Sequence, residues 1–282
     1  MFFTRLMSGI VLVLAAIALF FFGGIGLVIA LGILALAGAY ELLRVFGLEK
    51  HPLGIITYVG IVAYYGLMCW LDWDFETWSI AIILLLFLVL LLVYVIKYPA
   101  VHIQEVAKCF FAFFYLAVML SYIYKVRCFT AGQWLVWLIL ISSWGSDTCA
   151  YVVGKLIGKH HFSELSPKKT VEGCIGGIAG AAIIATVFAW FFPNSSSQYL
   201  FDGDLFQISP MLLFPIVVAI CAFISQLGDL AASAIKRNYE VKDYGHIIPG
   251  HGGILDRFDS VIFVAPIIYY VLIAFCYVGY VS

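Results

Sequence analysis

The chain has 282 residues, of which 65% are apolar, 17% are aromatic and only 11% are charged. A soluble domain carries roughly 25% charged residues, so this composition excludes a water-soluble globular protein. The net charge of −1 gives no sign of a nucleic-acid partner, and none is expected. The seven cysteines are scattered without CxxC spacing, which argues against a disulfide framework or a zinc site.

Apolar windows long enough to cross a bilayer, which takes about 20 residues per helix, recur along the whole chain. The predicted spans are 6–22, 25–43, 55–71, 78–96, 106–124, 134–157, 174–192, 208–235 and 260–281. The first window reads as a retained span and not as a cleaved signal. Only Gly23 and Gly24 separate it from the second, so the pair is either two helices or one broken helix. We therefore expect an all-α polytopic membrane protein with about nine transmembrane helices and a polar, cytoplasmic-facing pocket in the C-terminal half.

Lysine and arginine are unevenly divided between the loops. The N-terminus, the loops after the second, fourth, sixth and eighth spans, and their helix ends hold all of these residues except Lys125 and Arg127. By the positive-inside rule this side is cytoplasmic, and the odd number of spans places the C-terminus outside. We divide the chain into N-terminal helices (1–130, about five) and a C-terminal region with basic cytoplasmic loops (131–282, about four helices).

One acid lies late in the second span. Glu41 precedes Arg44 by three residues, a spacing that brings two side chains together on a helix. We interpret it as half of a helix-end ion pair and not as part of a site.

The sixth span carries a line of polar residues. Ser143, Asp147, Tyr151 and Lys155 follow one another at intervals of four, so they are expected on one helical face. An acid inside a span is costly and normally faces a bundle interior or an aqueous cavity. We favour a site role for Asp147 over a purely structural pairing.

The loop that follows, from Gly154 to Gly173, is basic and cytoplasmic. Lys168 and Lys169 precede Thr170, so ammonium and hydroxyl donors lie together beside a flexible backbone, as in polyphosphate sites. Ordinary positive-inside charge explains the same residues equally well.

The eighth span presents a hydroxyl, a carboxylate and a hydroxyl on one face. Ser225, Asp229 and Ser233 are spaced by four, and Lys236 and Arg237 follow where the helix reaches the cytoplasm. Hard oxygen ligands of this kind suit magnesium, which uses one or two carboxylates together with substrate phosphates.

The next loop is rich in glycine and charge. Gly252 and Gly253 let the backbone approach a ligand closely, and Asp256 and Asp259 share a face if the last span starts here. His251 is interpreted as a phosphate or base contact, or as a structural hydrogen-bonding group. Carboxylates opposed to cations at a membrane surface indicate phosphoryl or nucleotidyl transfer to a lipid.

The stretch from Ser233 to Asp259 resembles the signature of the phosphatidate cytidylyltransferase (CDP-diacylglycerol synthase) family. The matching residues are Ser233, Lys236, Arg237, Lys242, Asp243, Gly245, Pro249, His251, Gly252, Gly253, Asp256, Arg257 and Asp259. Two further matches are Trp144–Asp147 with Ala150 and Tyr151, and Ser166–Thr170 with Glu172 and Gly173. These motifs cover the second half of the chain; the first five spans match in general character only.

The resemblance implies that CTP and phosphatidic acid react to give CDP-diacylglycerol and pyrophosphate, with Mg2+ and room for a second cation such as K+. It implies that Asp229 and Asp256 hold the metal and that Lys236 and Asp259 complete the catalytic set. The expected substrate-binding residues are Asp147, Lys168, Lys169, Arg237, Lys242, His251, Gly252, Gly253 and Arg257. The expected partners are the two substrates and membrane lipids, and a homodimer is compatible with this interpretation.

Two other functions remain open at this point. A CTP-dependent polyprenol or lipid kinase would need a general base for a hydroxyl group. An ion-coupled transporter would place Asp147 and Asp229 along an ion path, but the chain lacks repeated halves.

Overall fold

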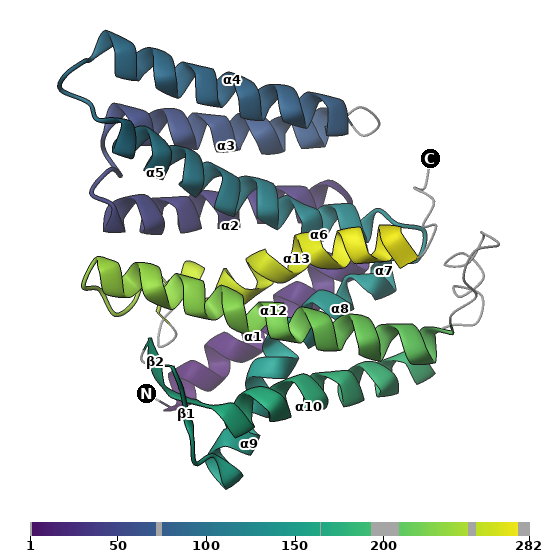
Figure 1. The fold of residues 1–282 in the computed structure, drawn as a ribbon. Coiled ribbons are helices and arrows are strands. Elements are labelled where there is room, and N and C mark those ends of the chain that lie inside the picture. Colours follow the sequence, from purple (N-terminus) through teal and green to yellow (C-terminus); the bar gives the residue numbers. More distant parts are fainter. Residues whose placement is uncertain (1, 72–74, 164, 193–208, 248–251, 276–282) are drawn as a thin grey trace. The chain divides into compact units, whose positions relative to one another are not determined.

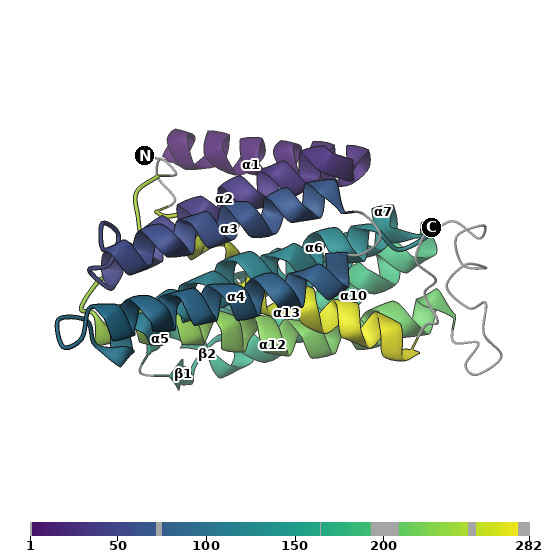
Figure 2. The same ribbon diagram turned by 90° about the horizontal axis from the view of Figure 1, so that it is seen from above.

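The computed structural model describes residues 2–71, 75–163, 165–192, 209–247 and 252–275, and these are almost entirely helical (Figure 1). Eight helical segments in the described part are long and apolar enough to cross a membrane, and α1 contains a shorter apolar segment. Two of the eight, Ile103–Arg127 and Gly132–Ile157, each join several of the shorter elements named below. The expectation of an all-α polytopic membrane protein is confirmed. Helix α1 (Phe2–Phe22) and helix α2 (Gly24–Val45) are separate, since Gly23 and Gly24 have φ of +60° and +58° and the chain reverses there (Figure 2).

The remaining elements follow the predicted windows closely. They are α3 (Pro52–Trp70), α4 (Phe75–Ile96), α5 (Ile103–Phe113), α6 (Met119–Arg127), α7 (Gly132–Leu135), α8 (Trp137–Leu140), α9 (Ser146–Ile157), α10 (Val171–Trp190), α12 (Pro210–Asn238) and α13 (Leu255–Phe275). Two π-helices, η1 (Phe114–Val118) and η2 (Ile141–Gly145), lie within the fifth and sixth windows. Helix α13 starts five residues before the expected 260, because the charges of Asp256 and Asp259 excluded a helical turn from the apolar window.

The chain forms two compact units. Unit 1 is Met1–Ser121 with Tyr239–Arg257, and unit 2 is Tyr122–Asn238 with Phe258–Ser282. The signature stretch is thus shared between the units. The division of the chain at residue 130 stays a prediction.

In unit 1, helices α2, α3, α4 and α5 pack side by side (Figure 1). Small residues on α2 permit this closeness: the Gly32 Cα faces the Tyr65 ring, and Gly38 faces Leu116. Tyr64 and Tyr65 are buried, and their hydroxyl groups bond to Ser121 Oγ and the Ala117 carbonyl, both at 3.1 Å. These two buried hydroxyl groups therefore have partners within the unit, as an apolar environment requires.

In unit 2, α10 packs against α9 and α12. Glycines along α10 line its contact with α9: Gly173 and Gly177 lie against Ala150, and Gly180 lies against Cys149. The Gln226 amide on α12 donates to the Cys174 carbonyl of α10 at 2.9 Å. Small residues thus bring the three helices close enough to build a site between them.

The loop after α9 is not irregular throughout, because it contains a short β-hairpin. Strands β1 (His161–Ser163) and β2 (Ser166–Thr170) pair antiparallel, with His161 opposite Thr170. The hairpin leads directly into α10. The all-α prediction missed these strands, which are too short to show an alternating pattern.

Candidate active site

Unit 2 contains a cavity of about 420 Å³ between α9, the hairpin, α10 and α12. Its lining includes Asp147, Tyr151, Lys155, Ser166, Lys169, Thr170, Gly173, Cys174, Gln226 and Asp229. Three predicted site residues, Asp147, Lys169 and Asp229, therefore meet at one cavity, although they come from three separate elements of the chain.

The predicted polar face of the sixth span is correct for three of its four members. Asp147, Tyr151 and Lys155 line the cavity from α9. Ser143 is buried outside the lining, and its hydroxyl donates to the Ile139 carbonyl at 2.9 Å. The reason is η2, because the i→i+5 hydrogen bonds of a π-turn shift the phase of the helix.

The strongest charge contact of the cavity joins the hairpin to α12. The Lys169 ammonium lies 2.5 Å from Asp229 Oδ2, and the two side chains are 25% and 26% exposed. Burial by itself would lower the pKa of Lys169, but the Asp229 carboxylate outweighs it and holds that pKa above its usual value. Lys169 is therefore a cation in the cavity, and Asp229 is a carboxylate whose counter-charge is a flexible side chain.

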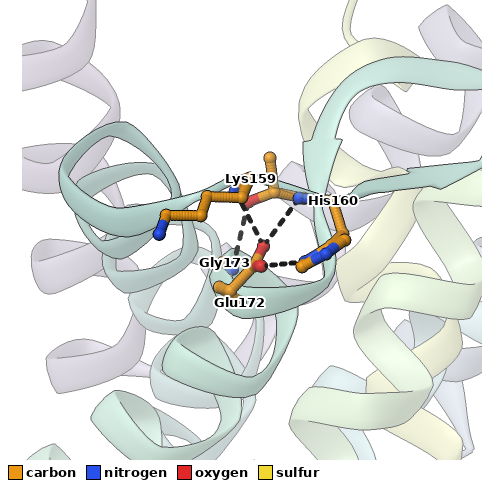
Figure 3. A network of polar contacts seen from close by, with 5 residues as sticks. Lys159, His160, Glu172 and Gly173 are labelled. Atoms are coloured by element: carbon orange, nitrogen blue, oxygen red, sulfur yellow. Dashed lines mark hydrogen bonds and ion pairs between the residues drawn. The ribbon is translucent and has the colours of Figure 1, made fainter.

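The hairpin is fixed at its base by Glu172 in the first turn of α10 (Figure 3). Glu172 Oε2 accepts the backbone N–H groups of Lys159 and His160 at 3.1 and 3.3 Å, and Oε1 lies 2.5 Å from His160 Nδ1. Glu172 belongs to a matching motif, but its partners lie 12 and 13 residues earlier in the chain and could not be predicted from helical spacing.

Thr170 has a structural part beside the cavity. Its hydroxyl accepts the Gly173 N–H at 3.1 Å and so caps α10. A Cβ at Gly154 or Gly158 would press against Thr170, so both glycines permit close packing beside this cap. The Lys168 backbone lies in β2.

The end of α12 and the part of α13 in unit 2 hold further members of the predicted set. Lys236 is half-buried and Arg237 is exposed in the last turn of α12. Asp259 on α13 is buried, and the charges of Asp229 and Lys236 act on it. Its Oδ1 accepts the Ser260 N–H at 2.7 Å. Asp229, Lys236 and Asp259 thus form one electrostatic cluster.

The other signature residues lie in unit 1, around the start of α13. Asp256 Oδ2 accepts the N–H groups of Tyr244 and Gly253 at 2.9 and 3.0 Å, so one carboxylate oxygen joins these two residues. Gly252 has a φ of +86°, a conformation that favours glycine. Lys242 and Arg257 are exposed. His251 lies outside the described residues.

Glu41 departs from its predicted role. The carboxylate is fully buried and accepts backbone N–H groups of Ile254 and Leu255, while Arg44 donates to the Tyr244 carbonyl at 2.8 Å. Both side chains therefore bind the backbone of the loop between α12 and α13, which carries part of the signature and is called the signature loop below. They do not merely end their own helix. The one signal in the sequence was an acid within an apolar span.

The donor chemistry of the cavity fits Mg2+. No group of three His, Cys, Asp or Glu side chains in the described part of the chain is arranged to hold a metal ion. Magnesium, however, is commonly held by one or two carboxylates with water and substrate phosphates. Asp147 and Asp229 line a cavity that also presents Lys169, so the protein supplies such carboxylates beside a cation for phosphate.

These observations define an integral membrane enzyme whose polar site lies among membrane-spanning helices and presents carboxylates and cations suited to phosphate chemistry. The sequence pattern of the cytidylyltransferase family matches residues 3–275. The chain belongs to this family and is a nucleotidyltransferase.

Curated proteins similar to the chain agree with that assignment. A phosphatidate cytidylyltransferase of Staphylococcus saprophyticus is 32% identical over 95% of this chain and 98% of its own length. One from Staphylococcus aureus (strain COL) is 30% identical with the same coverage. One from Bacillus subtilis is 38% identical over 61% of this chain and 60% of its own length.

Proposed function

We propose that the chain is a phosphatidate cytidylyltransferase, which converts CTP and phosphatidic acid to CDP-diacylglycerol and pyrophosphate. The observation that carries the proposal is the cavity in which Lys169 faces Asp229 beside Asp147. Relatives of that name that align with 95% of the chain support the same substrates.

The reaction does not require the protein to form a covalent bond with either substrate. A phosphate oxygen of the lipid, already an anion, attacks the α-phosphorus of CTP, and the bond from that phosphorus to the bridging oxygen breaks to release pyrophosphate. No Ser, Cys or His nucleophile is required. The protein has to align two polyanions and offset their charge as the transition state forms.

In this proposal Asp229 and Asp256 hold Mg2+, which when bound neutralises phosphate oxygens. Asp259 orients the Lys236 ammonium, and the catalytic set is completed by that lysine. A second cation such as K+ belongs to the same site. The substrate phosphates and base are contacted by Asp147, Lys168, Lys169, Arg237, Lys242, His251, Gly252, Gly253 and Arg257.

The proposed orientation places the N-terminus and the site in the cytoplasm of a bacterial-type inner membrane and the C-terminus outside. CTP is water-soluble and phosphatidic acid is held in the bilayer. A site at the cytoplasmic ends of the helices is the place where both are within reach. The asymmetry of lysine and arginine supports this orientation.

The test uses detergent-purified protein with CTP, phosphatidic acid and Mg2+, and follows pyrophosphate release. We expect activity in the parent and a loss of at least about 100-fold in Asp256→Asn, with the unfolding midpoint unchanged. A Glu105→Gln variant is the control, because Glu105 is a partly exposed residue that caps α5.

Other outcomes would contradict the proposal. Release of CDP with a polyprenol acceptor would show a kinase. Ion flux in liposomes without nucleotide, together with no pyrophosphate, would show a transporter.

A further inference from the structure

A buried acid of the N-terminal half reaches the signature loop. Glu41 lies one turn before the end of α2 and has no exposed surface. A carboxylate in such a place is costly unless hydrogen bonds satisfy it. Its partners therefore reveal why it is there.

Those partners are backbone amides at the start of α13. Glu41 Oε1 accepts the Ile254 N–H at 3.1 Å, and Oε2 accepts the Leu255 N–H at 2.9 Å. The first N–H groups of a helix have no partner within the helix, and they attract negative charge. Glu41 thus caps α13 from a position more than 200 residues earlier in the chain.

The loop is shaped to admit this carboxylate. A Cβ at Gly245 or at Gly253 would overlap the Glu41 carboxylate. Both glycines are therefore needed for close approach of the backbone. Two signature glycines are thus explained by a residue outside the signature.

Arg44 holds the opposite end of the same loop. Its Nη2 donates to the Tyr244 carbonyl at 2.8 Å. The Tyr244 N–H and the Gly253 N–H in turn donate to Asp256 Oδ2. The two N–H groups that bind the Asp256 carboxylate are therefore adjacent to backbone groups that side chains of α2 bind. The Tyr244 N–H belongs to the residue whose carbonyl binds Arg44, and the Gly253 N–H directly precedes the Ile254 N–H that binds Glu41.

We infer that Glu41 is a positioning residue for Asp256, acting through the backbone of residues 253–255. The inference rests on the proposed function, in which Asp256 belongs to the metal and phosphate site. Loss of a residue that supports a metal ligand typically costs about 10- to 100-fold in metal affinity or activity. The N-terminal half then contributes geometry to chemistry whose motifs all lie in the C-terminal half.

The experiment compares Glu41→Gln with Glu105→Gln. The first keeps the side-chain size but offers a single oxygen acceptor in place of two. The second neutralises another carboxylate of unit 1 that caps a helix, α5, away from the loop. Amide hydrogen exchange of peptides covering 239–258 measures the loop directly and needs no activity. Pyrophosphate release as a function of Mg2+ and CTP measures its consequence.

We expect amide exchange in 239–258 to accelerate at least about tenfold in Glu41→Gln, with other helices unchanged. We also expect kcat/KM to fall by about 10- to 100-fold and the Mg2+ concentration needed for half-maximal rate to rise. Glu41→Asp should recover part of the rate, because it restores both acceptors. Glu105→Gln should leave the loop and the rate as in the parent.

Two results would overturn the inference. One is unchanged exchange in 239–258. The other is faster exchange throughout the protein with an unchanged Mg2+ requirement, which is what a purely structural acid would give. If the parent itself released no pyrophosphate, the proposed function would fail, while the exchange measurement would still decide whether Glu41 holds the loop.

Discussion

The two units use their acids in different ways. In unit 1, Glu41 and Asp256 accept hydrogen bonds from backbone N–H groups. In unit 2, Asp147 and Asp229 line a cavity, and the partner of Asp229 is the Lys169 side chain. Backbone donors are fixed by the fold, whereas a lysine ammonium moves on rotatable bonds.

This difference suggests a division of labour. A carboxylate held by the backbone has a set position before any ligand arrives, which is the property needed for preorganisation. A carboxylate held by lysine can exchange that partner for a metal ion while the lysine turns to a phosphate. The proposed pair of metal ligands would then combine one fixed and one adaptable carboxylate.

The largest effect is expected from removing Asp229, the carboxylate that lysine holds. Asp229→Asn removes a proposed metal ligand and leaves the Lys169 ammonium in a half-buried place without its counter-charge. We expect kcat/KM to fall at least about 100-fold and Mg2+-dependent CTP binding to weaken, measured by pyrophosphate release and calorimetry. An unchanged CTP affinity would transfer the ligand role to Asp147, for which Asp147→Asn is the parallel variant.

A smaller effect is expected from disturbing the loop backbone that holds Asp256. Gly253→Ala places a Cβ against the Glu41 carboxylate, so the loop must shift and the rate should fall about tenfold. Gly66→Ala in α3 is the control, because no atom lies within 4 Å of its added Cβ. We expect Gly66→Ala to keep full activity and to gain about 0.5–1 kcal/mol in the free energy of unfolding. Equal losses in both variants would refute the contact with Glu41.

The smallest expected effect concerns pH: the stabilisation by the Lys169–Asp229 pair should not change near neutral pH. The folded-state pKa of Lys169 is raised, so the stabilisation by its pair with Asp229 is fully present below the ordinary lysine pKa of about 10.4. It is lost only as the pH rises through the raised value. The difference in unfolding midpoint between the parent and Lys169→Met should therefore stay constant from pH 6.5 to 9. A difference that shrinks toward pH 9 would contradict the ion pair.

The membrane spans could be predicted because a bilayer leaves the backbone few choices. A span must satisfy its own N–H and C=O groups, so a long apolar run implies a helix. The phase within a span is less certain. Ser143 lies outside the cavity that Asp147, Tyr151 and Lys155 line, and the π-turn of η2 between them has no signal in the spacing of polar residues.

The candidate site shows the same limit at longer range. Asp147 and Asp229 could be singled out, since acids in spans are rare and are placed for a reason. The Lys169–Asp229 contact and the reach of Glu41 to Leu255 depend on tertiary packing between elements far apart in the chain. Helical periodicity relates only near neighbours, and so it offered Arg44 as the partner of Glu41.

The fit between Glu41 and its two glycines also constrains how this sequence can drift. A methyl group at position 245 or 253 would overlap a full-length glutamate at 41, so we expect the three positions to be inherited as a set. A change at one is tolerated only if another retreats, as aspartate at 41 would. In a collection of descendants, these sites should vary together or not at all, despite their distance along the chain.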